Sequence, residues 1–244
     1  MKPKNTARAA ETAIRKLGKP AKARVLMRFF KTGPGEYGEG DRFCGVTMPV
    51  LRRLAREYQG MEHAETLKLL CSPWHEVRML ALLVWMDEFK RASTPRRREI
   101  HLSYLKHSRW INNWDLVDVS APWITGVWSL ENPSALSELR KRLCSNLLWD
   151  RRIAILSTLA WIRVGRFEVL TEFAAVLLRA PQEHEDLMHK ATGWMLREMG
   201  KRDRERLTAF LRQYGARMPR TMLRYAIEHY SLRDRKSWLA LGQS

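Results

Sequence analysis

The segment "INNWDLVDVSAPW", Ile111 to Trp123, places two tryptophans and two aspartates in a stretch whose apolar residues are typical of a core helix. Trp114 and Asp118 are four residues apart and therefore share one face of a helix. A carboxylate buried beside an indole is costly unless a partner compensates its charge. An indole face attracts cations, and a carboxylate stabilises a developing positive charge on a sugar. We therefore interpret this face as an exposed working surface.

The chain is predicted to be all-α and repetitive. Apolar residues recur at three- and four-residue spacing, and short breaks with Pro or Gly separate the runs. Five helical segments can be superimposed, and their second residues are separated by 36, 38, 38 and 34 positions: Arg78, Trp114, Arg152, Lys190 and Arg224. This spacing is close to that of HEAT- and armadillo-type repeats, which stack into a curved solenoid with a concave groove.

We expect residues 1–244 to form a single α-solenoid domain. Its parts are N-terminal basic helices at about 1–31, a Gly-rich loop at 32–42 and stacked helical repeats at 43–238. The loop segment "KTGPGEYGEGDRF" has turn chemistry, and we interpret it as a connector. It lacks the G-K-[ST] ending of a phosphate-binding loop, so no nucleotide cofactor is expected.

Matching positions of successive repeats form a stripe along one surface of a solenoid. The second-residue stripe consists of four cations and one indole. Four residues further on, the neighbouring stripe contains two carboxylates, an indole and two leucines: Leu82, Asp118, Leu156, Trp194 and Glu228. We infer that both stripes line a basic concave groove. Four of these residues are expected to converge in its middle: Trp114, Asp118, Arg152 and Trp194.

Structural interpretations of the same residues stay open. Trp114 and Trp194 can equally be core residues, because aromatic side chains are mostly buried. Arg152 can pair with Asp118 across neighbouring repeats as a functionally silent ion pair. Asp115 is interpreted as a solvated or capping carboxylate near a helix start.

The charge of the chain indicates a polyanionic partner. There are 44 Lys and Arg against 26 Asp and Glu, a formal net charge of +18 with a pI near 10.4. Like charges repel one another in the compact state, so we attribute the excess to binding of nucleic acid. The expected DNA-binding residues are Arg78, Arg151, Lys190 and Arg224. Cations for phosphates, together with a carboxylate and two indoles, indicate cleavage of an N-glycosidic bond in DNA.

Other residue types exclude several classes of protein. Three cysteines, Cys44, Cys71 and Cys144, form no CxxC pair, which fits a reducing cytoplasm and argues against disulfides or a zinc site. His184 and His189 are five residues apart and miss the HExxH pattern, so no metal is expected. No apolar run has transmembrane length, and the N-terminus lacks the apolar region of a signal peptide. We expect a soluble, cytoplasmic monomer that associates with the nucleoid and not with membranes.

From about Arg24 to Trp238 the sequence resembles the AlkD family of bacterial DNA alkylation repair glycosylases. Four segments carry the resemblance, in order along the chain: "FCGVTMPVLRRLA", "NNWDLVDVSAP", "WDRRIAILSTL" and "HKATGWMLREMGK". None is informative alone, whereas four in order over this length are specific. The chain departs from the family pattern in its Gly-rich loop and at Asn113, where well-known members often have a second tryptophan.

The resemblance implies stacked HEAT-like repeats that hold duplex DNA in a basic groove. It implies excision of cationic N3- or N7-alkylated purines without a cofactor and without flipping the base, unlike most base-modifying enzymes. By motif position, Trp114 and Trp194 would contact the deoxyribose at the lesion. Asp118 would stabilise the sugar cation and position the attacking water, and Arg152 would hold the adjacent phosphate.

Two other functions compete with a glycosylase. One is a non-catalytic HEAT-repeat scaffold that binds DNA or RNA, and the other is an adaptor whose basic groove takes acidic peptides. A binding module has no need for Asp118 among cationic stripes, whereas a glycosylase does. The sequence therefore favours the enzyme.

Overall fold

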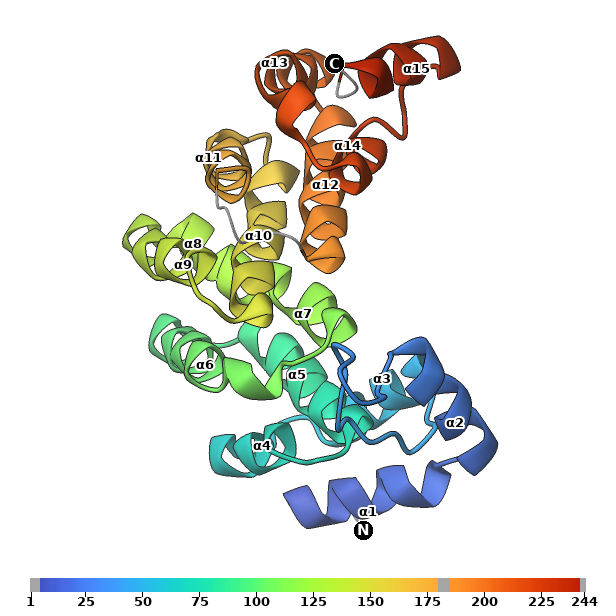
Figure 1. Cartoon of the computed structure of the whole chain (residues 1–244). Helices are drawn as coiled ribbons and strands as arrows, with labels where there is room; N and C mark the ends of the chain where they lie inside the picture. Colours follow the sequence, from blue (N-terminus) through green and yellow to red (C-terminus); the bar gives the residue numbers. More distant parts are fainter. Residues whose placement is uncertain (1–4, 180–184, 242–244) are drawn as a thin grey trace. The chain divides into compact units, whose positions relative to one another are not determined.

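The computed structural model describes residues 5–179 and 185–241, and the regular elements in these stretches are helices (Figure 1). The prediction of an all-α chain is confirmed for them, because extended pairing is limited to one isolated bridge between Arg42 and Trp74. The chain divides into two compact units, Met1–Ser120 and Ala121–Ser244. The single domain over 1–244 stays a prediction, and His184 of the rejected metal pattern lies outside the described residues.

The first unit is built around one central helix. Its elements are α1 (Ala7–Leu17), α2 (Pro20–Phe29), α3 (Met48–Glu57), α4 (His63–Leu70), α5 (His75–Phe89), α6 (Thr94–Lys106), a 3-10 turn (Ser108–Trp110) and α7 (Trp114–Ser120). Helix α5 contacts α1, α3, α4, α6 and α7. Its sequence is apolar on all sides, as is typical of a helix surrounded by others, and its tryptophan Trp85 is fully buried.

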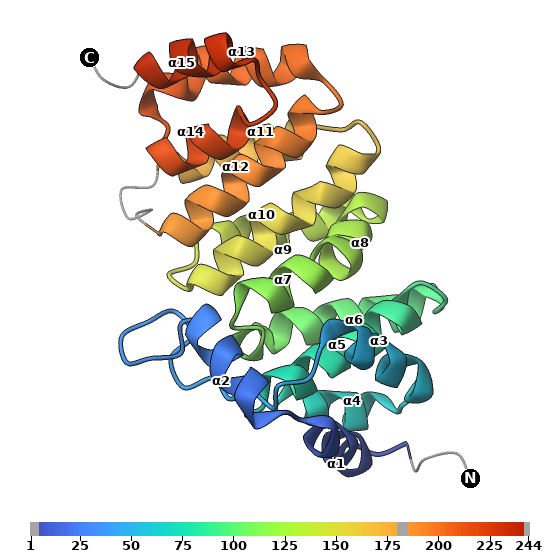
Figure 2. The same ribbon diagram turned by 90° about the vertical axis from the view of Figure 1, so that its right-hand side faces the viewer.

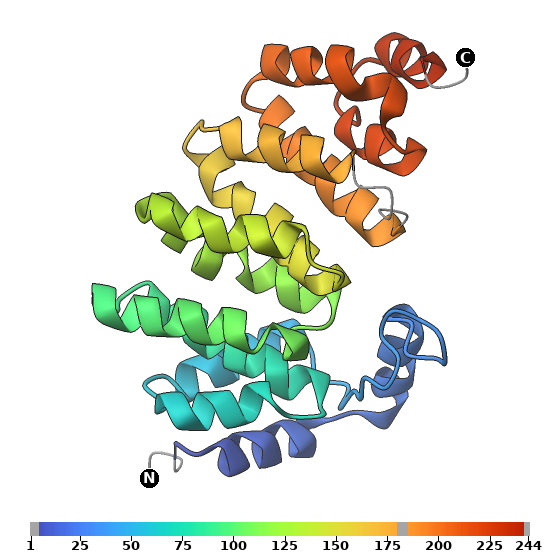
Figure 3. The same cartoon turned by 60° about the vertical axis from the view of Figure 1, so that its left-hand side comes forward.

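The segment between α2 and α3 contains the predicted Gly-rich loop. It folds back along the C-terminal end of α2 (Figure 3), and the N–H of Gly38 donates to the carbonyl of Lys31 at 3.0 Å. Lys31 has a positive φ of 51°, and a Cβ on Gly38 would lie 2.4 Å from the carbonyl oxygen of Phe30. The loop path therefore depends on a glycine at this close approach.

The second unit repeats the plan of a central helix. Its elements are a π-turn (Pro122–Gly126), α8 (Val127–Glu131), a 3-10 turn (Pro133–Ala135), α9 (Leu136–Leu143), α10 (Leu148–Arg163), α11 (Glu168–Leu177), α12 (Asp186–Gly200), α13 (Arg204–Tyr214), a 3-10 turn (Gly215–Arg217), α14 (Arg220–Ala226) and α15 (Leu232–Ala240). Helix α10 contacts α8, α9, α11 and α12. Helices α10, α12 and α14 lie side by side in sequence order (Figure 2).

The predicted repeat is recognisable in the order of helices. The five superimposed segments lie on α5, α7, α10, α12 and α14, with other helices between successive members. The last one is shorter than expected: α14 ends at Ala226, so Glu228 lies beyond the helix that carries Arg224. The chain has a helical-repeat fold, while the basic concave groove stays a prediction.

Among the residues that the structure describes, none of the helices combines the length and the apolar character needed to cross a membrane.

The packing of α12 against α14 predicts a specific effect of Gly193→Ala. A Cβ at this position would lie 2.5 Å from the carbonyl oxygen of Met222 and 2.6 Å from the Cβ of Tyr225, so the two helices must separate. We expect a loss of about 1–3 kcal/mol in the free energy of unfolding, measured by urea denaturation.

Gly200→Ala, on the same helix, is the matched control. Its Cβ would lie 2.3 Å from Cδ2 of Leu207, the end of a buried side chain that can change its rotamer, whereas the Met222 carbonyl cannot move without its helix. We expect the control to stay within about 1 kcal/mol of the wild type. Equal losses in both variants would contradict the close approach of α12 and α14.

Candidate active site

Helix α7 presents the two residues on which the sequence analysis centred. Leu116 and Val117 are buried, whereas Trp114 and Asp118 are both half-buried and share one side of the helix. This face is therefore partly covered, and the exposed working surface that the sequence suggested stays a prediction. The side chain of Asp118 is also engaged within the fold.

The indole of Trp114 is held by the segment that follows α2. Its Nε1–H donates to the hydroxyl oxygen of Tyr37 at 3.2 Å. Its ring centroid lies 5.2 Å from that of Phe30 and 5.9 Å from that of Phe29, which is 61% exposed. The Gly-rich loop is thus more than a connector, because Tyr37 belongs to it.

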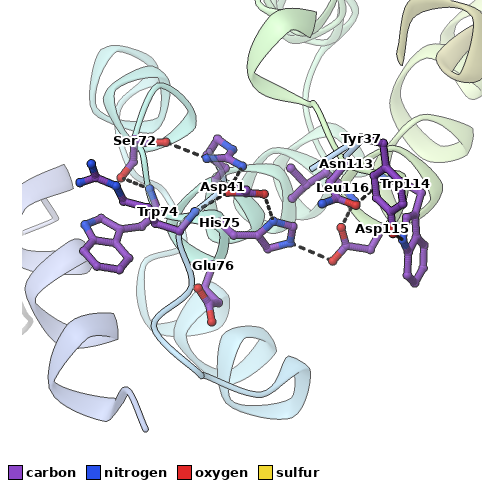
Figure 4. A network of polar contacts seen from close by, with 12 residues as sticks. Tyr37, Asp41, Ser72, Trp74, His75, Glu76, Asn113, Trp114, Asp115 and Leu116 are labelled. Carbon is purple, nitrogen blue, oxygen red and sulfur yellow. Dashed lines mark hydrogen bonds and ion pairs between the residues drawn. The ribbon is translucent and has the colours of Figure 1, made fainter. Parts of the chain in front are cut away.

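A buried polar network lies beside Trp114 and is joined to it through its neighbour Asp115 (Figure 4). The ring of His75 is hydrogen-bonded through Nδ1 to Asp41 at 2.7 Å and through Nε2 to Asp115 at 2.9 Å. Arg78 donates through Nη2 to Asp41 at 2.7 Å and through Nη1 to the carbonyl of Ser72 at 3.0 Å. The network joins the Gly-rich loop, the first turn of α5 and the first turn of α7.

The charges of this network reinforce one another. Burial alone lowers the pKa of His75, but the hydrogen bonds and the negative charges of Asp115 and Asp41 outweigh it and raise the pKa to about 9. Burial raises the pKa of Asp41, yet the hydrogen bond from His75 and the charge of Arg78 bring it below its usual value. His75 is therefore an imidazolium at neutral pH.

Several predictions about exposure are wrong. Arg78 is 3% exposed, and its guanidinium forms an ion pair with Asp41. The prediction that Arg78 faces an open groove is therefore wrong. Leu82 and Leu156 are fully buried, because α5 and α10 are surrounded by other helices of their units. Asp115 is not a solvated carboxylate, because one of its oxygens pairs with His75. Its other oxygen accepts the first-turn N–H of Leu116 at 2.8 Å, as expected of a carboxylate near a helix start.

In the second unit, the start of α10 is anchored to the start of α12. Arg152 is 4% exposed, and its Nη1 donates to the carbonyl of Leu187 at 2.6 Å. The expected open position of Arg152 is therefore also wrong, since most of its side chain is enclosed. Arg151 is half-buried and donates to the carbonyl of Ser145 at 2.8 Å.

Two other predicted DNA-binding residues keep substantial exposure. Lys190 is half-buried as a residue and forms an ion pair with Asp186 at 2.6 Å. Arg224 is exposed on α14.

The indole of Trp194 on α12 is half-buried and oriented by its own helix. Its Nε1–H donates to Glu198 at 3.2 Å, one turn further along. Burial raises the pKa of Glu198, but hydrogen bonds from Lys201 and Trp194 and the charge of Arg202 lower it below its usual value. Glu198 thus stays ionised and can hold the indole in one orientation.

The predicted site residues fall into two local groups. Trp114 and Asp118 lie together on α7, and Arg152 and Trp194 lie on the adjacent helices α10 and α12. Convergence of all four involves both units and stays a prediction.

Sequence reasoning missed the residues that support Trp114: Tyr37, Asp41 and His75. Their partners are 34 to 77 positions away in the chain, so no periodic pattern connects them. The only signal was the presence of Tyr37 and Asp41 within an otherwise turn-forming segment.

Within residues 5–179 and 185–241, no group of three or more His, Cys, Asp and Glu side chains could hold a metal ion.

The imidazolium of His75 predicts a pH dependence of stability. Its pKa is about 9 in the folded protein and 6.5 in an ordinary environment, so its contribution is complete below pH 6.5 and is lost as pH rises through 9. We expect the free energy of unfolding to decrease between these pH values in the wild type. His75→Gln should remove this part of the dependence, as measured by urea denaturation at a series of pH values.

His63→Gln provides the control, because burial lowers the pKa of His63 and its titration lies below this window. A decrease of the same size in His75→Gln and in the wild type would show that another group is responsible.

Comparisons with known proteins agree with the fold and with the sequence motifs. The family model described as "DNA alkylation repair enzyme" matches residues 10–230. A solved structure, "Predicted DNA alkylation repair enzyme from Enterococcus faecalis", is similar with a TM-score of 0.66 at 16% sequence identity, over 88% of this chain and 97% of the other. At this identity the likeness shows the fold alone. None of the curated proteins matches. The family match over nearly the whole chain shows that this protein belongs to the DNA alkylation repair enzyme family.

Proposed function

We propose that this protein is an alkylpurine DNA N-glycosylase that hydrolyses the N-glycosidic bond of cationic N3- or N7-alkylated purines in duplex DNA without flipping the base. The observation that carries the proposal is the pairing of Asp118 and Trp114 on one half-buried side of α7. Family membership supports a role in DNA alkylation repair.

The enzyme does not need to protonate the leaving group, because the alkylated purine is already cationic. The bond between C1′ and the purine nitrogen breaks, and its electron pair neutralises the purine. The deoxyribose is left as an oxocarbenium-like cation, which the carboxylate of Asp118 stabilises. Water then attacks C1′ and gives its proton to Asp118, which leaves an abasic site and a free base.

The two indoles support the sugar on which the charge develops. An indole face attracts cations and polarised C–H groups, so Trp114 and Trp194 are the proposed contacts of the deoxyribose. Each indole N–H is already bonded to a protein acceptor, Tyr37 for Trp114 and Glu198 for Trp194. Both rings are therefore oriented before DNA binds, which reduces the entropy lost on binding.

The proposed phosphate contacts come from the basic residues of α10, α12 and α14. Arg152 is largely enclosed and anchored to the carbonyl of Leu187, so its proposed action on the phosphate beside the lesion is through its positive charge and not as an open ligand. Arg151, Lys190 and Arg224 add sequence-independent attraction for the backbone. The net charge of +18 supports such a polyanionic partner.

The same proposal covers the biological setting. The protein acts as a cytoplasmic monomer on alkylated duplex DNA at the nucleoid, without a nucleotide cofactor or a membrane partner.

Asp118→Asn tests the proposed chemistry. We expect the wild type to release 3-methyladenine and 7-methylguanine from methylated duplex DNA, and the variant to lose about 10²-fold or more of the single-turnover rate constant. The amide keeps the shape of the side chain but removes the charge that stabilises the sugar cation. Duplex affinity should be kept or increased.

Asp87→Asn is the control, because Asp87 lies on α5 in the same unit and forms a common i,i+3 ion pair with Lys90. If neither the wild type nor Asp118→Asn releases base while both bind duplex DNA, the non-catalytic scaffold is the correct function. If the wild type does not bind duplex DNA, an adaptor for acidic peptides is favoured.

Arg224→Ala tests the proposed contact with the DNA backbone. Arg224 is exposed on α14, so its removal is expected to weaken duplex binding and to reduce the slope of log K against log salt by about 0.9. Fluorescence anisotropy at a series of salt concentrations measures both quantities. Arg212→Ala, exposed on α13 and outside the predicted stripes, should keep the wild-type slope. The same slope in all three proteins would exclude Arg224 from the interface.

A further inference from the structure

None of the groups of the polar network beside Trp114 contacts the reacting atoms in the proposed bond cleavage. The network joins three elements that are distant in the sequence: Asp41 in the Gly-rich loop, His75 at the start of α5 and Asp115 in the first turn of α7 (Figure 4). Asp41 and His75 are almost completely buried, and the side chain of Asp115 is 19% exposed. Buried charges are retained only where each has a partner, so the arrangement constrains all three elements.

The geometry requires a protonated ring. A neutral imidazole has one N–H and would turn the lone pair of its other nitrogen toward a carboxylate oxygen less than 3 Å away. The imidazolium donates to both carboxylates, and Arg78 supplies the second positive charge at Asp41. The positive charges of His75 and Arg78 then equal the negative charges of Asp41 and Asp115.

Two other charged residues lie close to the network, Glu76 and Lys22. Glu76 is buried next to His75, and its carboxylate accepts the backbone N–H groups of Cys44, Gly45 and Val46 at 2.7–3.1 Å. Lys22 lines the crevice that also borders His75 and Asp115. Neither replaces a member of the network.

Aromatic rings enclose the imidazolium. The His75 ring stacks on Phe43 with centroids 4.3 Å apart and lies 5.2 Å from Phe30. Phe30 in turn lies 5.2 Å from the indole of Trp114. Aromatic faces attract cations, so the same rings that hold the imidazolium also support the indole.

Helix α7 is held at its first turn by two contacts from one loop. Tyr37 accepts a hydrogen bond from Trp114, and Asp41 acts through His75 on Asp115. The α-helical segment of α7 spans seven residues before the chain passes into the π-turn, so the orientation of its first turn depends on tertiary contacts. Displacing its first turn would move Trp114 and Asp118 together.

We propose that His75 and Asp41 are positioning residues for base excision, which act through Asp115 to hold α7 in the orientation that Trp114 and Asp118 need at the sugar. This inference rests on the proposed glycosylase function. The catalytic arrangement then depends on the proton of His75, although His75 touches neither the DNA nor the reacting atoms.

The first test measures single-turnover base release and duplex affinity against pH for the wild type, His75→Gln and the control His63→Gln. The wild type and the control are expected to lose activity as pH rises through about 9, where His75 loses its proton. His75→Gln should be slower by roughly tenfold to hundredfold at pH 7, without this alkaline decline. Its duplex affinity should stay within about twofold, because a positioning effect lies in the rate constant.

A wild-type rate constant in His75→Gln, or the same alkaline decline in His75→Gln and the wild type, would overturn the inference. Asp41→Asn gives an independent measurement if His75→Gln does not fold. This substitution removes the negative charge of one carboxylate beside the imidazolium, which lowers the pKa of His75. The alkaline decline should therefore move to lower pH. An unchanged midpoint in Asp41→Asn would also overturn the inference.

The second test does not depend on base release by the protein. The ¹⁵N-NMR signal of the Trp114 indole N–H is expected to shift with the titration of His75, and its midpoint should fall in Asp41→Asn. If the signal follows His75 while the wild type releases no base, the proposed function fails but the coupling of His75 to α7 stands. If the signal is insensitive to the titration of His75, the positioning role is wrong.

Discussion

The arrangement of the first unit depends on one buried cation between two carboxylates. Neither Asp41 nor His75 can be enclosed without its partner, because an unpaired charge away from water is strongly unfavourable. Satisfying both requires that the Gly-rich loop return to the start of α5 and that α7 begin beside it. A polar constraint thus determines where Trp114 and Asp118 lie, while the apolar surface of α5 supplies the burial that stabilises the unit.

The second unit follows a related plan. Its central helix α10 is apolar over most of its length, and its buried charged residues lie in the first turns, as those of α5 do. Asp150 accepts from Arg142 at 2.5 Å and from Ser145 at 3.1 Å, and Arg152 donates to the carbonyl of Leu187. In both units the polar end of the central helix ties in a neighbouring segment. Asp115, next to Trp114, is joined to the first of these ends, and Arg152 lies at the second.

Such an arrangement suits a reaction with a cationic leaving group. In the proposed base excision the purine needs no protonation, so the demands on the protein are charge at the sugar, rigid surfaces around it and affinity for the DNA backbone. Three features of the protein correspond to these demands: a carboxylate on α7, two indoles whose N–H groups are already bonded, and an excess of positive charge. Under the proposed function, side chains that are oriented before DNA binds reduce the binding energy spent on ordering them.

The sequence by itself determined that the chain is all-α, which five segments recur along it, and that Trp114 and Asp118 share one face of α7. These properties follow from local spacing, since residues four apart on a helix are neighbours whatever surrounds them. Only the tertiary structure decided which faces are covered. Arg78, Leu82 and Leu156 look exposed when the repeats are superimposed, yet they lie on central helices that other helices enclose. It also decided that Asp115 pairs with His75, 40 positions away, because partners brought together by folding leave no periodic mark in the sequence.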